Sequence, residues 1–432
     1  MSKKLLILIL ILFVNHCSFN KNSNFWNSIE VKEDDNREEL FKKVEITNFE
    51  INEDLDVNIE TSKFLKNSFQ NNLTNNNGRL NYDGKFKKAK KFRFSKIAKF
   101  SEFEPEIIFD EDNIIFFSDK GAILKFDSRS KLIWKKNYYS KQEKKLRPFL
   151  FFAKNNEVLI VADNIAKTYA LNINTGELLW SKDNTSAFNS EIKVYEDYFF
   201  VVDYENNLRC FSTKDGQEIW KVSTENSLLK SQKKLSIVIH KNKVFFNNSI
   251  GDITAVNIDS GNLQWIVPTL KNTNYSSNYF LKISNLLASG DSIYFSTNMN
   301  EFYSVDIDSG TTNWIKNINS SLRSTIIDNI IFSISDEGFL NIINSTNGEI
   351  IRRTNLFFKI KVKKRNKIKP VGFVVGKNKI YVSIDNGRIF IVDIKTGKTK
   401  SSLKVANNHI SRPFILNESL FIIKDNGIIK IE

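Results

Sequence analysis

The sequence predicts an all-β fold, an eight-bladed β-propeller built from four-stranded antiparallel blades. Three observations predict it: a motif of a turn followed by tryptophan recurs, paired β-hairpins lie between its copies, and incomplete strand sets stand at the two ends of the repeat region. A repeat period of about 40 to 50 residues is typical of stacked repeat architectures. Short apolar runs separated by turn residues are typical of strands.

The recurring motif is a glycine turn followed by a strand that ends in tryptophan. In LNINTGELLW (Leu171–Trp180), the glycine can take the positive φ of a tight turn at little cost. The four intervals between the five tryptophans are 46, 40, 45 and 49 residues. We expect these side chains to pack between neighbouring blades, at Trp134, Trp180, Trp220, Trp265 and Trp314. The turn glycines of the docking motif, including those of two worn copies that lack tryptophan, are Gly176, Gly216, Gly261, Gly310, Gly348 and Gly397.

Two apolar segments joined by a small polar turn precede most copies of the motif. KIYVSIDNGRIFIVD (Lys379–Asp393) is an example, and Asp-x-Gly between β-branched and aromatic runs is a hairpin signal. The region lacks a convincing 3.6-residue apolar period, which argues against a helical solenoid. Each unit is therefore a meander of about four strands, as in a propeller blade.

The two ends of the repeat region set the number of blades. Seven units are visible, and one further strand pair, Asn417–Glu432, follows the seventh without a closing strand. KFRFSKIAKF (Lys91–Phe100) is similar to the strand that follows a turn and can complete this last blade. Joining both ends in one blade removes an open sheet edge. We therefore predict that residues 91–432 form eight blades.

Composition and motifs restrict the chemistry of the chain. The net charge is +14, but the lysines are spread along the chain without a recognition motif, so we expect no nucleic-acid partner. The three histidines, His16, His240 and His409, lack neighbours at metal-ligand spacing. No nucleophile elbow, phosphate loop or zinc-protease motif is present. The sequence therefore predicts no metal site and no catalytic residue.

The N-terminus is similar to a bacterial lipoprotein signal. Lys3 and Lys4 precede an apolar run, Leu5–Val14, and a cysteine follows at Cys17. The resemblance implies that residues 1–17 are the signal segment and that the mature chain starts at a lipidated Cys17. Small residues usually precede such a cysteine, whereas Asn15 and His16 stand here. Ordinary cleavage, or a short retained anchor, is the alternative.

Residues 18–90 form an extension before the repeats. Asn71–Gly78 (NNLTNNNG) is a polar, low-complexity stretch that predicts a flexible tether. Two strongly basic stretches stand out in the chain, Lys85–Lys96 and Lys359–Lys369. Each can be interpreted as a contact with anionic lipid or an anionic partner, or as a solvated edge or loop.

The Asp-x-x-Thr-Gly-x-x-x-Trp pattern resembles the tryptophan-docking repeat of pyrroloquinoline-quinone (PQQ) type eight-bladed propellers. That family includes quinoprotein alcohol dehydrogenases and the BamB-like outer-membrane assembly lipoproteins, which are not enzymes. The quinoproteins resemble one another in adjacent cysteines over the cofactor, but this chain has only Cys17 and Cys210. The resemblance therefore favours a BamB-like scaffold without cofactor over the alternatives, a periplasmic PQQ-dependent dehydrogenase or a generic ligand-binding propeller.

The same resemblance implies a place and partners. A BamB-like chain would be anchored by its lipid to the periplasmic face of the outer membrane, as a monomer within a complex. It would bind a barrel-assembly machinery subunit (BamA-like) and nascent outer-membrane proteins. The family's leucine-plus-basic partner segment matches NSLLKSQ here, at Leu228, Leu229 and Lys230. Adjacent leucines can also be a buried anchor between blades, which is the alternative.

Overall fold

The computed structural model describes residues 49–432, apart from 52–56, 58, 60–61, 69–71, 85–88, 98–99, 101–103, 229–230 and 270–280. The lipoprotein-type signal with Cys17, and two of the three predicted partner-binding residues, Leu229 and Lys230, lie outside the described residues.

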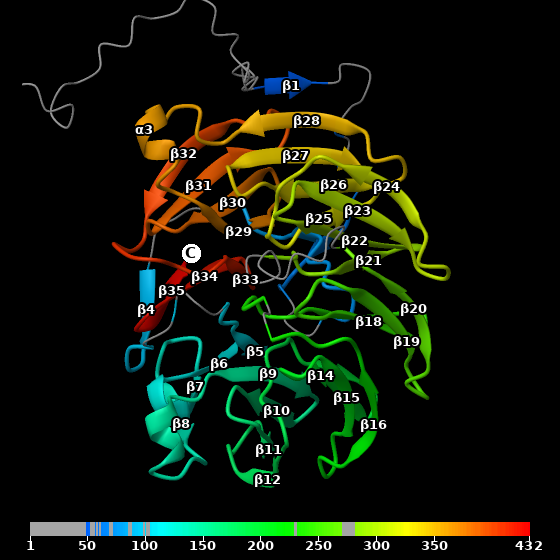
Figure 1. The fold of residues 1–432 in the computed structure, drawn as a ribbon. Helices are drawn as coiled ribbons and strands as arrows, with labels where there is room; N and C mark the ends of the chain where they lie inside the picture. Colours follow the sequence, from blue (N-terminus) through cyan, green and yellow to red (C-terminus); the bar gives the residue numbers. More distant parts are fainter. Residues whose placement is uncertain are drawn as a thin grey trace, which may run out of the picture. The chain divides into compact units, whose positions relative to one another are not determined.

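Eight sheets form the fold, each with an antiparallel meander of four strands, and Figure 1 shows them following one another around a centre. The first strand of a meander is innermost, because the contacts between neighbouring sheets join first strands such as those of the second and third sheets. This arrangement confirms the predicted eight-bladed propeller.

The strands follow the chain from blade to blade. The first blade contains β5 (Ile108–Asp110), β6 (Asn113–Phe117), β7 (Ile123–Phe126) and β8 (Leu132–Lys136), and the second contains β9 (Leu150–Asn155), β10 (Val158–Asp163), β11 (Lys167–Asn172) and β12 (Leu178–Asp183). The third blade contains β13 (Lys193–Tyr195), β14 (Tyr198–Val202), β15 (Asn207–Ser212) and β16 (Glu218–Ser223), and the fourth contains β17 (Ile237–His240), β18 (Lys243–Asn247), β19 (Ile253–Asn257) and β20 (Leu263–Val267). The fifth blade contains β21 (Leu287–Ser289), β22 (Ser292–Thr297), β23 (Glu301–Asp306) and β24 (Thr312–Lys316). The sixth contains β25 (Thr325–Ile327), β26 (Ile330–Ile334), β27 (Phe339–Asn344) and β28 (Ile350–Asn355), and the seventh contains β29 (Pro370–Val375), β30 (Lys379–Ile384), β31 (Arg388–Asp393) and β32 (Thr399–Lys404).

The eighth blade joins the two ends of the repeat region. It contains β33 (Phe414–Leu416), β34 (Ser419–Lys424) and β35 (Gly427–Ile431), and β4 (Ala89–Arg93) pairs antiparallel with β35 as its outer strand. The closure is the predicted one, but the strand ends at Arg93, well before Phe100. Beyond Arg93 the chain leaves the ladder, and the amide of Ile97 donates to Asp425 O at 2.8 Å.

A bulge recurs in the outer hairpin of seven blades. In the second blade the register shifts between Ala170 and Leu171, and Ala170 pairs with Trp180. The same shift occurs in each of the other six blades whose outer hairpin carries the turn motif. A bulge re-aims the side chains that flank it, so it sets the direction of the tryptophan.

The core lies between the sheets. The second strand of seven blades carries a large aromatic side chain that is almost or completely buried, at Phe116, Phe199, Phe245, Phe295, Phe332, Tyr381 and Phe421. Burying a side chain of this size stabilises a fold by about 1.5–3 kcal/mol. Because both faces of each blade are apolar, the blades are stable only when they stack.

The segment before the propeller is bound to it. β1 (Phe49–Ile51) pairs with the outer edge of β28, β3 (Arg79–Leu80) pairs parallel with β29, and β2 (Phe64–Leu65) pairs parallel with β3. The tether predicted for Asn71–Gly78 is therefore wrong for its described part, residues 72–78. The side chains of Asn75 and Asn76 donate to residues far away in the sequence, Glu191 and Ile326 O, and the local sequence does not reveal these hydrogen bonds.

Helical structure is slight in the described part of the chain. Two 3-10 turns, η2 (Asp119–Gly121) and η3 (Glu143–Leu146), and one short helix, α3 (Val362–Arg365), lie in connections. None of the described helices is long and apolar enough to cross a membrane.

Candidate functional site

The tryptophans dock on the glycine turns of the following blade. A Cβ built on Gly216 would lie 2.5 Å from Trp180, and a Cβ built on Gly176 would lie 2.9 Å from Trp134. Trp220 is in the same position against Gly261, Trp265 against Gly310, and Trp314 against Gly348. Only glycine allows this approach, since each turn also has a φ near +70°.

Hydrogen bonds complete most of these joints. The indole N–H of Trp180 donates to Thr213 O of the next blade at 2.9 Å, and Trp134, Trp265 and Trp314 donate in the same way at 3.0–3.2 Å. The seventh turn differs, because its glycine, Gly397, faces Thr354 and Arg352 of the preceding blade instead of a tryptophan. The docking tryptophans and turn glycines therefore hold neighbouring blades together.

Two faces of the ring can be distinguished. The turn face carries the glycine turns, and the entry face carries the connections through which the chain enters each innermost strand. The basic loop Lys359–Lys369, which connects β28 to β29, lies on the entry face, as does the leucine segment that connects β16 to β17. The sequence-predicted binding candidates in these two connections thus share one face.

Leu228 projects from the entry face. Its side chain is fully exposed, with a relative exposure of 102%, so it is not a buried anchor between blades. The connection is held on both sides: Asn226 donates to Glu205, and Ser231 is buried with its amide donating to Ser249 O at 2.9 Å. An exposed leucine between two fixed points is available to a partner.

A cluster of buried charges fills the centre of the ring. Six of its members come from the segments just before the innermost strands, and Lys193 is the first residue of β13, so the ring brings together residues from six different blades. We call it the channel cluster: Glu106, Glu191, Lys193, Lys234, Asn285, Arg323 and Arg412, of which Arg412 and Glu106 keep side-chain exposures of 13% and 9%. Sequence reasoning missed it. The signal that could have found it is a charged or amide residue two positions before β5, β13, β21, β25 and β33.

Glu106 and Glu191 are the anionic members of the channel cluster. Glu106 lies 3.3 Å from Lys234, 3.1 Å from Arg412 and 3.5 Å from Arg323. Burial alone would raise the pKa of Glu106, but its cationic partners outweigh burial and hold that pKa well below its usual value. Glu191 is similarly placed, with its pKa lowered by Arg323 and Lys193 against the effect of burial.

The channel cluster is reached by the N-terminal segment from the turn face. The amide of Ile239 donates to Leu73 O at 2.8 Å and that of Ala288 to Thr74 O at 3.0 Å. The Asn75 side chain, fully buried, donates to Glu191 at 3.0 Å and to Leu286 O at 3.0 Å. Residues 72–78 therefore close the channel at this end.

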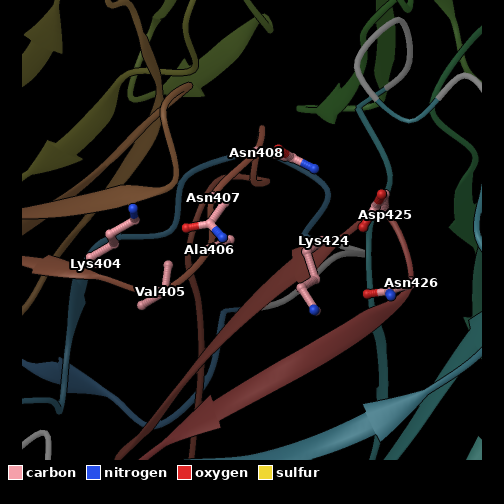
Figure 2. Close-up of a pocket in the computed structure, with 8 residues that line it drawn as sticks. All are labelled: Lys404, Val405, Ala406, Asn407, Asn408, Lys424, Asp425 and Asn426. Carbon is pink, nitrogen blue, oxygen red and sulfur yellow. The ribbon is translucent and has the colours of Figure 1, made fainter.

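Cavities open on the entry face. One, of about 580 Å³, has the end of β32 and the residues after it, Lys404–Asn408, and the β34–β35 turn, Lys424–Asn426, on two sides of it (Figure 2). Half of its lining is exposed, and most of the lining is polar, with neutral amides among the charges. A second cavity of about 300 Å³ lies at the mouth of the channel and is lined by Arg412, Lys369 and Glu104 among others.

Two of the three histidines, His240 and His409, and one cysteine, Cys210, lie within the described residues. Within the described ranges, no group of three or more His, Cys, Asp or Glu residues could hold a metal ion. His240 contacts Gly290 O at 3.0 Å, and His409 packs on Phe100. Cys210 is buried in β15, and burial raises the pKa of its thiol to about 12.

Comparisons with known proteins agree with this geometry. Residues 119–354, more than half of the chain, match the family model described as outer membrane protein assembly factor BamB. No curated protein sequence matches significantly.

Among solved structures, BamB from Moraxella catarrhalis is 14% identical with a TM-score of 0.63, and the match covers 79% of this chain and all of that one. A computationally designed protein, Ika8, is 13% identical with a TM-score of 0.59, covering 78% of this chain and 99% of that one. A europium-containing methanol dehydrogenase is 11% identical with a TM-score of 0.63, covering 83% and 90%. At these identities the structural matches show the fold alone.

Proposed function

Because the chain belongs to the family of the outer membrane protein assembly factor BamB, we propose that it is a non-enzymatic scaffold that binds a barrel-assembly machinery subunit (BamA-like). In this role it assists the insertion of β-barrel proteins into the outer membrane from the periplasmic side. The observation that carries the proposal is the full exposure of Leu228 in a connection fixed at both ends.

Leu228 supplies the apolar contact of the proposed interface. Burying one leucine in a partner's pocket is worth about 1.5–3 kcal/mol, which suits one anchor of a moderate interface. Because Asn226 and Ser231 already hold the connection, binding costs less conformational entropy than for a free loop. Leu229 and Lys230, which follow directly in the sequence, extend the same proposed contact.

A second mode of binding follows from the outer edges of the blades. β1 of this chain adds as an antiparallel strand to the outer edge of β28. The outermost strands of other blades, such as β12 and β16, end their sheets without a further strand in the described part of the chain. Such edges accept extended segments by β-augmentation, so they are suited to nascent outer-membrane strands.

The membrane anchor belongs to the same proposal. A lipid on Cys17 would hold the propeller at the periplasmic face of the outer membrane, and several acyl chains give stable anchoring where one does not. Metabolic labelling with radioactive palmitate tests this step. We expect label on the parent and none on a Cys17→Ser variant, and an unlabelled parent would contradict lipid attachment.

The docking site is tested by affinity capture from native membranes in detergent. Tagged parent, Leu228→Asp and Leu146→Asp would be compared, with the partner identified by mass. Leu146 is a matched control, because it is also an exposed leucine, in the connection between β8 and β9. We expect parent and control to recover the barrel-assembly subunit, and Leu228→Asp to recover at least about tenfold less, since a buried aspartate is costly.

Capture of no barrel-assembly subunit by parent or control would overturn the proposal. The dehydrogenase alternative would then be tested by the absorbance of bound quinone and by activity after adding quinone and calcium. Equal capture by all three forms would retain the assembly role but remove Leu228 from the interface.

A further inference from the structure

The entry face leads into a pocket that is closed at its inner end. Residues 72–78 occupy the channel at its turn-face end, and the channel cluster lies next to them on the side of the entry face. On the entry face the cavity of about 300 Å³ shares Glu104, Leu322 and Arg412 with a smaller inner cavity of about 20 Å³. The inner cavity is also lined by Arg323 and Asn285, so its walls belong to the channel cluster.

Two arginines beside the inner cavity have buried N–H groups without partners. Arg323 has 8% relative exposure, and neither its Nε nor its Nη1 has a hydrogen-bond partner. Arg412 Nη1 is in the same situation, while Arg412 Nη2 is bound to Glu106. Buried guanidinium donors are costly to leave unsatisfied, and an oxyanion is the group that matches their geometry.

The charges around the cavity are not balanced. Within the channel cluster, two carboxylates, Glu106 and Glu191, face four cations, Lys193, Lys234, Arg323 and Arg412. At the rim, Glu104 is paired with Lys233 at 3.7 Å. Asp336 and Asp385 line the outer cavity together with Lys282 and Lys369. The surplus of two positive charges is therefore buried, where charge without a counterion is unfavourable.

We propose that this pocket binds a small anion in the outer cavity, with one oxygen of its carboxylate or phosphate group entering the inner cavity between Arg323 and Arg412, where about 20 Å³ leaves room for a single water-sized group. Arg323 and Arg412 donate to the anionic group, and Lys369 and Lys282 attract it at the mouth. The site goes beyond the scaffold role, because it lies on the axis and does not include the exposed leucine connection.

Isothermal titration calorimetry on the full chain in detergent tests the site. Inorganic phosphate and succinate would be titrated separately at constant ionic strength, so that the two chemical classes are distinguished. We expect saturable binding at one site for at least one of them. Arg412→Gln should weaken it by about tenfold or more, as expected for the loss of a charge-assisted hydrogen bond.

Two further variants keep the test decisive. Lys369→Gln changes an exposed residue at the mouth and should weaken binding by about two- to fivefold through the lost attraction. Arg129→Gln, an exposed arginine in the turn between β7 and β8, should bind as the parent does. Absence of saturable binding for both ligands would overturn the proposal and leave water as the occupant. Parent binding that neither Arg412→Gln nor Lys369→Gln weakens would also overturn it.

Discussion

Lys193 Nζ lies 2.6 Å from Asn75 Oδ1, although 118 residues separate the two in the sequence. Lys193 begins the innermost strand of the third blade, whereas Asn75 belongs to the segment before the propeller. Both side chains are fully buried, and the hydrogen bond between them satisfies a donor of Lys193 and an acceptor of Asn75 beside the channel cluster. The pair fastens the N-terminal segment to the centre of the ring.

Replacing Asn75 with alanine should destabilise the protein. The change removes one acceptor of Lys193, which still donates to Asn72 O at 2.8 Å, and a donor to Glu191, and unsatisfied buried groups of this kind cost about 1–3 kcal/mol. Urea unfolding measures the loss, with the exposed Asn262→Ala as a control that should stay near the parent. A loss at Asn75 no larger than in the control would contradict the role of this residue as a fastener.

Replacing Gly216 with alanine should cost more than replacing Gly290. Both glycines have a positive φ, of +70° and +59°, so both changes carry backbone strain of about 1–2 kcal/mol. Only at Gly216 would the new Cβ also meet Trp180, at 2.5 Å, whereas nothing lies within 4 Å of a Cβ at Gly290. The difference in melting temperature between the two variants therefore measures the effect of the contact with Trp180. Equal decreases in melting temperature would show that this contact has no effect on stability.

Stability should decrease as the pH falls below about 4.5. The pKa values of Glu106 and Glu191 in the fold lie below the ordinary 4.5 of glutamate, so the unfolded chain binds more protons in this range. Their contribution is present above pH 4.5 and is lost as the pH falls through the lowered values, at about 1.4 kcal/mol per unit of pKa difference.

The acid effect can be assigned by substitution. Urea unfolding at several pH values between 3 and 7 should give a shallower pH dependence for Glu106→Gln than for the parent. An unchanged dependence in this variant would assign the acid sensitivity to other carboxylates.

The Cys210 thiol should be inert in the folded protein. Burial raises its pKa to about 12, so little thiolate exists near neutral pH, and the sulfur is shielded in β15. In a Cys17→Ser background, a thiol reagent such as dithionitrobenzoate should react only after unfolding in urea. Rapid reaction of the native protein would mean that the third blade opens readily.

The sequence by itself determined the ring. The spacing of the tryptophans, the turn glycines and the hairpin pattern predicted the blades, and the strand sequences at the ends predicted the closure in the eighth blade. These features are local: a turn with positive φ needs glycine, and a half-buried strand needs an apolar face. Local rules of this kind can be read from a single blade and then counted along the chain.

Only the tertiary structure decided what occupies the centre. Glu106, Glu191 and Arg323 are single polar residues in separate connections, and only closure of the ring brings them within hydrogen-bond distance. Residues 72–78 are polar enough to predict a tether, yet their amides match buried groups of several blades. Such long-range pairing depends on the positions of all eight blades at once, because a buried hydrogen bond is favourable only where the fold has already excluded water.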